Sequence, residues 1–175
     1  MFAYLLTLLG VLGHAIPHPG LPLTAVGGSL LYFGARRSLW QGIIPVAALA
    51  ATDYYLTTHV YNFPFVISGY LITWAWYAAV IVLGALLLSQ RTTVARVASG
   101  VVLASTSFFV VSNYAVWFGQ NGMYPHTLAG LATCYVAALP FYGYDLASTA
   151  VVAALAFGIP QIIRQHEASK QGQTL

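Results

Sequence analysis

The feature that most restricts the fold of this chain is its succession of apolar runs, separated by short polar or Gly/Pro segments. Only 5% of the 175 residues are charged, whereas soluble domains carry about a quarter, and 59% are hydrophobic. Such a chain belongs in a bilayer, where an α-helix satisfies its backbone hydrogen bonds internally. We therefore predict an all-α membrane protein with one integral membrane domain, residues 1–164, and a polar cytoplasmic tail, residues 165–175.

The apolar runs and the residues between them locate the helices. Helices are predicted at residues 2–14, 23–35, 39–52, 65–89, 97–118 and 144–164. A further short run, residues 128–139, ends at Pro140. A helix of about 13 residues covers about 20 Å of a roughly 30 Å hydrocarbon core. The shortest helices therefore need extra turns, a thinner bilayer or shelter inside the bundle.

The basic residues indicate how the chain crosses the membrane. The six Lys and Arg are Arg36, Arg37, Arg91, Arg96, Arg164 and Lys170. With six spans and a cytoplasmic N-terminus, all of them lie inside, as the positive-inside rule requires. We therefore predict a six-transmembrane-helix bundle in the inner membrane with both termini cytoplasmic. Residues 128–139 are interpreted as a re-entrant or interfacial helix on the outer side; the alternative is a seventh span, which would leave Arg164 and Lys170 outside.

This topology collects polar side chains at the outer face, including four of the five His and two of the three acids. Residues 112–145 carry the densest polarity in the chain. Binding pockets combine apolar walls with a few placed polar groups, so we predict a small-molecule site at this face. The residues predicted to line it are Asp53, His59, Asn62, Asn113, Trp117, Tyr124 and His126.

Two predicted helices carry stripes at helical spacing that should turn inward. The stripes are Tyr70, Thr73, Trp74 and Tyr77, and Ser105, Phe109, Ser112, Asn113 and Trp117. Small residues that permit close helix approach are Gly27 and Gly28, and Ala47, Ala48, Ala50 and Ala51. For Tyr54, Tyr55 and Tyr61 an interfacial aromatic belt remains an open alternative to a site.

The acids and the single cysteine have different interpretations. Asp53 ends its predicted helix, where the helix dipole disfavours an anion by roughly 0.3 to 1 kcal/mol, so a functional role is favoured. Asp145 is predicted to start the last helix, where capping explains an acid. Cys134 lies in an apolar helix and is interpreted as a small hydrophobic residue without catalytic function.

Other function classes find little support in the sequence. His14 and His18 have the H-x3-H spacing of zinc sites, but Pro17 argues against a helix that would align them, so they are weak metal candidates and no cofactor is predicted. No G-x-S-x-G, H-E-x-x-H or P-loop motif is present. The scattered cations exclude a nucleic-acid partner. A membrane redox or metal-binding enzyme using outer-face histidines, and a structural protein without a ligand, remain alternatives.

Several segments together resemble one family of membrane proteins. They are PHPGLPLTAVGGSLLYFGARR, DYYL, SFFVVSNYAVW and MYPHTLAGLATCYVAALPF. They are similar to the DUF6580 family, which is grouped with S-components of energy-coupling factor transporters. The resemblance covers nearly the whole chain. The family usually carries a carboxylate after PFF. In this chain Asp145 in PFYGYD matches that carboxylate, with altered spacing. Phe2 stands where metal-type S-components have His.

The resemblance implies a six-helix substrate-binding subunit for uptake of a vitamin-like nutrient, held by outer loops and helix ends. It also implies a partner, an energy-coupling ATPase module, for some relatives. Cobalamin is the most concrete ligand that it offers. A buried thiol is a poor ligand because its thiolate is disfavoured, so we expect the imidazole of His126, and not Cys134, to approach the cobalt if cobalamin binds.

Overall fold

The computed structural model describes residues 1–15, 25–119 and 123–172, and all regular secondary structure within them is helical. The elements are α1 (Phe2–Ala15), α2 (Val26–Arg36), the 3-10 helix η1 (Leu39–Gly42), α3 (Ile43–Tyr55), the π-helix η2 (Leu56–Val60), α4 (Ile67–Leu88), α5 (Val94–Phe118) and α6 (Leu128–Gly172). The predicted all-α class is confirmed. The first five predicted helices agree with α1 to α5 apart from a few residues at their ends.

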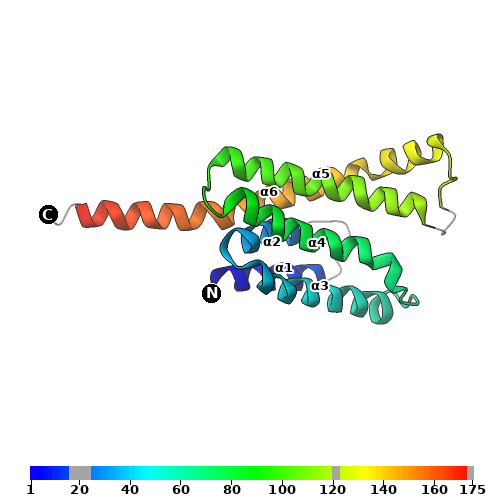
Figure 1. The fold of residues 1–175 in the computed structure, drawn as a ribbon, viewed down its shortest axis with the longest axis horizontal. Coiled ribbons are helices and arrows are strands. Elements are labelled where there is room, and N and C mark those ends of the chain that lie inside the picture. The colour runs from blue at the N-terminus through cyan, green and yellow to red at the C-terminus, as the bar shows by residue number, and fades with distance from the viewer. Residues whose placement is uncertain (16–24, 120–122, 173–175) are drawn as a thin grey trace.

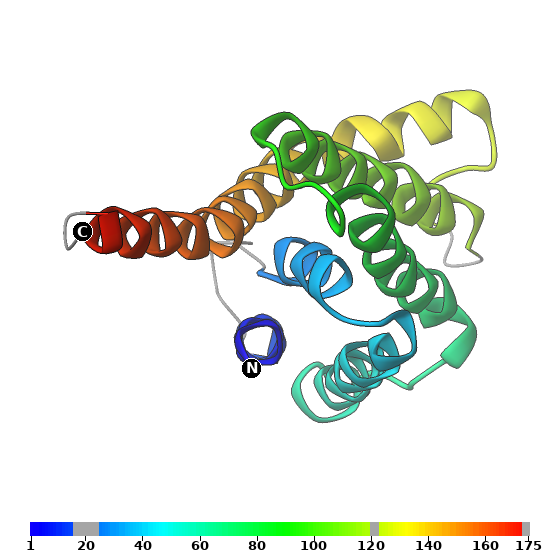
Figure 2. The ribbon, with the colours of Figure 1, turned by 60° about the vertical axis from the view of Figure 1, so that its left-hand side comes forward.

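The helices lie side by side, and each runs opposite to the one before it (Figure 1). α2 occupies the centre, with α1, α4, α5 and α6 packed around it (Figure 2). Every residue of α2 from Val26 to Ala35 is buried. Its 11 residues cover only about 16 Å. Its neighbours therefore shelter this short helix from lipid, which is one of the solutions expected from its length.

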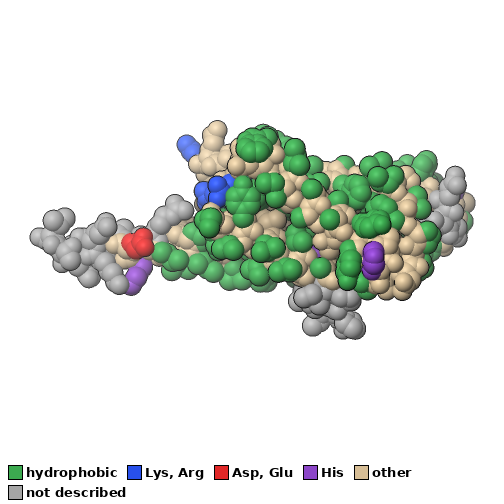
Figure 3. Space-filling view, turned by 90° about the horizontal axis from the view of Figure 1, so that it is seen from below, with side chains coloured by type: hydrophobic (Ala, Val, Ile, Leu, Met, Phe, Trp, Pro, Cys, Tyr) green, Lys and Arg blue, Asp and Glu red, His purple; other side chains and the backbone are tan. Residues whose placement is uncertain are grey.

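The two ends of the bundle carry different side chains. The arginine end is where α2 ends and α5 begins, with Arg36, Arg37, Arg91 and Arg96 (Figure 1). The histidine end is where α1 and η2 end and α6 begins, with His14, His59 and His126. Figure 3 shows arginine side chains, together with a histidine and an acid on α6, toward one end of the molecule and another histidine toward the other end. No side chain coloured as Lys, Arg, Asp or Glu is visible on the long middle part of that face.

Apolar side chains cover the sides of the bundle between these ends (Figure 3). On α1, for example, Leu5, Leu8 and Leu9 are exposed. Three of the described helices are long and apolar enough to cross a membrane: α4, α5 and the Leu128–Ile163 part of α6. α3 is shorter, but η1 and η2 extend it into one helical stretch over residues 39–60. An apolar surface of this kind is what lipid tails require.

α6 corrects the sequence prediction. Residues 128–139 and 144–164 were predicted as separate helices with a break after Pro140, but they form one continuous helix that contains Pro140 and Pro160. The predicted separate re-entrant or interfacial helix is therefore wrong. The same helix continues through the predicted polar tail as far as Gly172, and extends beyond the arginine end (Figure 1).

Contacts with α5 on both sides of Pro140 explain why the helix does not break there. Before the proline, the Tyr135 hydroxyl donates to the Val110 carbonyl oxygen at 2.7 Å. After it, the Tyr142 hydroxyl lies 3.0 Å from the Thr106 hydroxyl. Proline is tolerated inside membrane helices where neighbouring helices support the backbone. Packing against α5 therefore keeps α6 continuous at Pro140, where the local sequence favours a break.

Small residues bring α2 close to α6. A Cβ added to Gly27 would lie 2.6 Å from Thr149 Oγ1, and one added to Gly28 would lie 2.8 Å from the Val152 side chain. The predicted role of these two glycines in close helix packing is therefore confirmed. The predicted alanine cluster on α3 behaves differently, because Ala47 and Ala50 line an open groove.

Candidate functional site

The carboxylate of Asp53 is bound by side chains from two other helices at the histidine end. Asp53 is only 7% exposed. Its Oδ1 lies 2.8 Å from His14 Nε2 on α1, and its Oδ2 accepts a hydrogen bond from Trp74 Nε1 on α4 at 3.0 Å. Among the side chains that the structure describes this is the only ion pair, formed when His14 is protonated. Both carboxylate oxygens are thus engaged by the protein, so Asp53 links α1, α3 and α4.

Aromatic rings continue from Trp74 toward the end of the bundle. The Phe65 ring stacks on Tyr70 with centroids 4.8 Å apart, and lies 6.3 Å from Trp74. The Tyr70 hydroxyl is hydrogen-bonded to the Thr57 hydroxyl. The inward orientation predicted for Tyr70 and Trp74 is therefore confirmed, and Phe65, which the sequence did not predict, also belongs to the cluster.

His59 and Asn62 lie beside this cluster and not within it. His59 is exposed, stacks on Tyr55 at 5.2 Å, and places Nδ1 2.6 Å from the Thr58 hydroxyl. Asn62 is exposed and has a φ of 56°, a left-handed conformation that Asn tolerates better than most residues. Neither contacts the Asp53 carboxylate. Tyr54, Tyr55 and Tyr61 are each about half exposed, as an interfacial belt requires.

The other predicted residues form a second group between α5 and α6. Trp117 Nε1 donates to the Pro125 carbonyl oxygen at 3.0 Å, and the Trp117 ring lies 5.5 Å from the exposed His126 ring. Asn113 Nδ2 donates to the Phe109 carbonyl oxygen at 2.7 Å. Tyr124 is half-buried. No hydrogen bond or aromatic contact between described residues joins this group to Asp53, so the seven predicted residues do not share one pocket.

A cavity of about 190 Å³ opens between α5 and α6. Its lining residues are Ser105, Phe108, Phe109, Ser112, Asn113, Ala138, Phe141, Tyr142 and Asp145. Four of the five stripe residues predicted on α5 line it, so the inward orientation of that stripe is confirmed. Of the predicted site residues, Asn113 alone reaches this cavity. Ser105 lies about 12 Å deeper along α5 than Asn113.

The polar groups of this cavity differ in how well they are satisfied. Ser112 donates to the Phe108 carbonyl oxygen at 2.6 Å, and Asn113 and Tyr142 have the partners given above. Ser105 Oγ and Asp145 Oδ2 are buried, and neither has a hydrogen-bond partner within 3.5 Å among the described residues, although the Ser105 hydroxyl lies close enough to act on the Asp145 carboxylate. The interpretation of Asp145 as a helix cap is wrong, because the continuous α6 places it well inside the helix.

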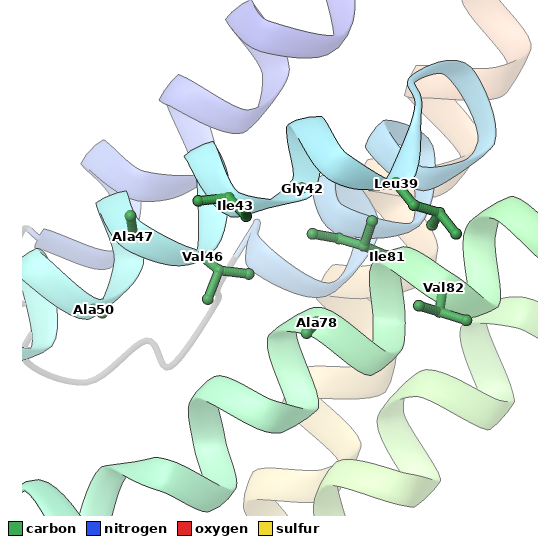
Figure 4. A pocket seen from close by; sticks show the side chains of 9 residues that line it. All are labelled: Leu39, Gly42, Ile43, Val46, Ala47, Ala50, Ala78, Ile81 and Val82. Carbon is green, nitrogen blue, oxygen red and sulfur yellow. The ribbon is translucent and has the colours of Figure 1, made fainter.

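A second hollow, of about 320 Å³, lies between α3 with η1 and α4 (Figure 4). Its lining residues are Leu39, Gly42, Ile43, Val46, Ala47, Ala50, Ala78, Ile81 and Val82. All of these are apolar or glycine. The groove therefore offers no side-chain group that would orient a polar ligand, and the α5–α6 cavity is the better candidate site.

Comparison with known families identifies the chain. A family model described as "Family of unknown function (DUF6580)" matches residues 1–171. The chain belongs to the DUF6580 family. No curated protein and no solved structure matches it. In this DUF6580 protein the match covers both the Asp53 cluster and the α5–α6 cavity.

The histidines of this DUF6580 protein do not take part in a group of three metal-ligating side chains in the part of the chain that the structure describes. No three of His, Cys, Asp and Glu come together there. His14 contacts Asp53, whereas His18, the other weak metal candidate, lies outside the described residues. Cys134 is 2% exposed, and its Sγ lies 3.5 Å from the Asn113 carbonyl oxygen.

The functional candidates that sequence reasoning missed in this DUF6580 protein are Asp145 and its cavity neighbours Phe141 and Tyr142. A signal for Asp145 was present, since an ionisable residue within an apolar span is by default a functional candidate. The predicted break after Pro140 concealed it by moving Asp145 to a helix start. The sequence placed Ser105 in the predicted stripe on α5. The structure adds that the Ser105 hydroxyl is buried without a hydrogen-bond partner within 3.5 Å, which makes it a candidate ligand-binding group.

Proposed function

We propose that this DUF6580 protein is the substrate-binding membrane subunit of an uptake system for a small, partly aromatic nutrient. The observation that carries the proposal is the α5–α6 cavity, which combines aromatic walls with Asp145 Oδ2 and Ser105 Oγ, two buried polar atoms that make no hydrogen bond of normal length with the described residues. Unpaired polar groups inside a membrane bundle are costly, and they mark substrate pathways in such proteins. A ligand that engages them recovers part of that cost.

The proposed orientation places the histidine end outside the inner membrane and the arginine end in the cytoplasm. Arg36, Arg37, Arg91 and Arg96 support it through the positive-inside rule. The alternating direction of α1 to α6 supports six crossings with both termini inside (Figure 1). The resemblance to S-components supports an energy-coupling ATPase module as partner, because the sequence itself has no P-loop.

The orientation is tested by cysteine labelling in a Cys134→Ser background. Ser38 and Val60 are both exposed and lie at opposite ends of the η1–α3–η2 stretch. We expect Val60→Cys to react with a membrane-impermeant maleimide in intact cells, and Ser38→Cys to react only after permeabilisation. The reverse pattern would rule out this orientation. Labelling of both variants in permeabilised cells serves as the control for reactivity.

The cavity is tested by filling it. Ala138 lines the cavity, so Ala138→Phe should occupy part of its space without removing any polar group. Native mass spectrometry of protein released from nanodiscs measures the co-purified small molecule. We expect the wild type to carry a defined adduct and Ala138→Phe to lower its occupancy by roughly tenfold, as about 1.4 kcal/mol of lost affinity would do.

The adjacent Ala137→Phe is the matched control, because Ala137 is exposed on the same helix and does not line the cavity. It adds the same side chain and should leave the adduct unchanged. An adduct that survives Ala138→Phe, or the absence of any specific adduct in the wild type, would count against the proposal.

The volume of the cavity favours a small nutrient. At about 190 Å³ it lies below the roughly 300–1,000 Å³ of drug-sized ligand pockets. A corrinoid would therefore need space beyond the helix ends, near the exposed His126. That an imidazole and not Cys134 would approach the cobalt of cobalamin stays a prediction, and the burial of Cys134 is consistent with it.

A further inference from the structure

Asp145 and Ser105 provide two unpartnered polar groups at the centre of membrane-spanning segments. Asp145 lies midway along Leu128–Ile163, and Ser105 lies midway along α5. Ser105 is 1% exposed, and its hydroxyl and Asp145 Oδ2 both lack a described hydrogen-bond partner. Neither Arg nor Lys lines their cavity. A cation that meets the carboxylate would lower the cost of its burial, and the cavity lining supplies none.

The walls of the cavity indicate which kind of cation fits. Phe108, Phe109, Phe141 and Tyr142 supply aromatic rings, which attract organic cations and pack against apolar groups. A metal ion would instead need several oxygen ligands. Here Asp145 supplies the one carboxylate in the cavity lining. A primary ammonium needs fewer ligands, because its three N–H groups can donate to one carboxylate and one hydroxyl.

We infer that the α5–α6 cavity binds a small aromatic or apolar primary amine in its protonated form. The ammonium group donates to the Asp145 carboxylate and to Ser105 Oγ, and the apolar part lies among the phenylalanine rings toward Asn113. This inference rests on the proposed function, since it names the ligand class of the same cavity. It deepens that proposal by making charge, and not shape alone, the basis of selection.

The test compares two probes that have nearly the same shape. Phenethylamine is protonated at neutral pH, and 2-phenylethanol is its neutral counterpart. Equilibrium dialysis against the full-length protein in nanodiscs, with empty nanodiscs subtracted, measures both dissociation constants. We expect the amine to bind at least about tenfold more tightly, since hydrogen bonds to charged groups are roughly twice as strong as neutral ones.

Variants locate the preference on Asp145. Asp145→Asn should weaken phenethylamine binding at least about tenfold and leave 2-phenylethanol binding within about twofold, whereas Asp145→Glu should retain a preference for the amine. Circular dichroism and gel filtration check that each variant folds. If Asp145→Asn does not fold, Ser105→Ala takes its place. It should weaken amine binding by a smaller factor, because it removes one of two acceptors.

The outcomes separate this inference from the proposed function. If both probes bind equally, and Ala138→Phe abolishes both, the cavity binds ligands but the inference of an amine is overturned. An amine preference that survives Asp145→Asn overturns it equally, as does amine binding that is unchanged in Ser105→Ala where that variant is used instead. If the wild type retains neither probe above empty nanodiscs, both the inference and the cavity as a site for small aromatic ligands are rejected.

Discussion

Gly84→Ala is expected to destabilise the protein by roughly 3 kcal/mol or more, the upper end of the range for overpacked cores. A Cβ at Gly84 on α4 would overlap the carbonyl oxygen of Leu31 on α2, and one at Gly34 on α2 would overlap that of Ile81 on α4. The obstacle is backbone and not a flexible side chain, so α2 and α4 must move apart. α2 packs more extensively against α4 than against any other helix, so this movement would loosen the whole core.

The same helix supplies a matched control. Gly69 on α4 has no neighbour that an added Cβ would meet. Gly69→Ala should therefore be neutral or stabilise the protein by about 0.5–1 kcal/mol, because alanine restricts the unfolded chain more than glycine does. Unfolding in mixed micelles titrated with SDS, followed by far-UV circular dichroism, measures both variants. Equal stability of the two variants would show that the backbones of α2 and α4 do not approach each other closely at Gly84.

His14→Leu is expected to cost about 3 kcal/mol of folding free energy, because it leaves the buried Asp53 carboxylate with Trp74 as its only partner. This value is the lower end of the range of stability losses for buried ion pairs that lose one partner, because the His14 side chain is 24% exposed. The free energy of unfolding in the same mixed micelles measures the loss. Solvent near His14 screens part of the charge.

A double-mutant cycle isolates the interaction between His14 and Asp53. If the pair interacts as the geometry indicates, His14→Leu should cost distinctly less in an Asp53→Asn background than in the wild type. His59→Leu provides the control, because His59 is exposed and does not contact Asp53; its effect should stay within about 0.5 kcal/mol. Additive effects of His14→Leu and Asp53→Asn would contradict the pair.

The sequence by itself determined the class of the protein. Apolar composition and helical periodicity are local properties, so they identified the all-α membrane class, the inward stripe on α5 and the close packing at Gly27 and Gly28. The similarity that spans residues 1–171 identified the family. Each of these conclusions depends on residues a few positions apart or on segments compared directly, so none of them requires knowing which helices are neighbours.

Only the tertiary structure decided which polar groups meet. His14 and Asp53 are 39 residues apart in the chain, and their contact depends on how α1 packs beside α3. α6 continues through Pro140 because α5 binds it on both sides, and this continuity places Asp145 in the same cavity as Ser105. The register between two helices is set by packing along their whole length, and no short segment of the sequence encodes it.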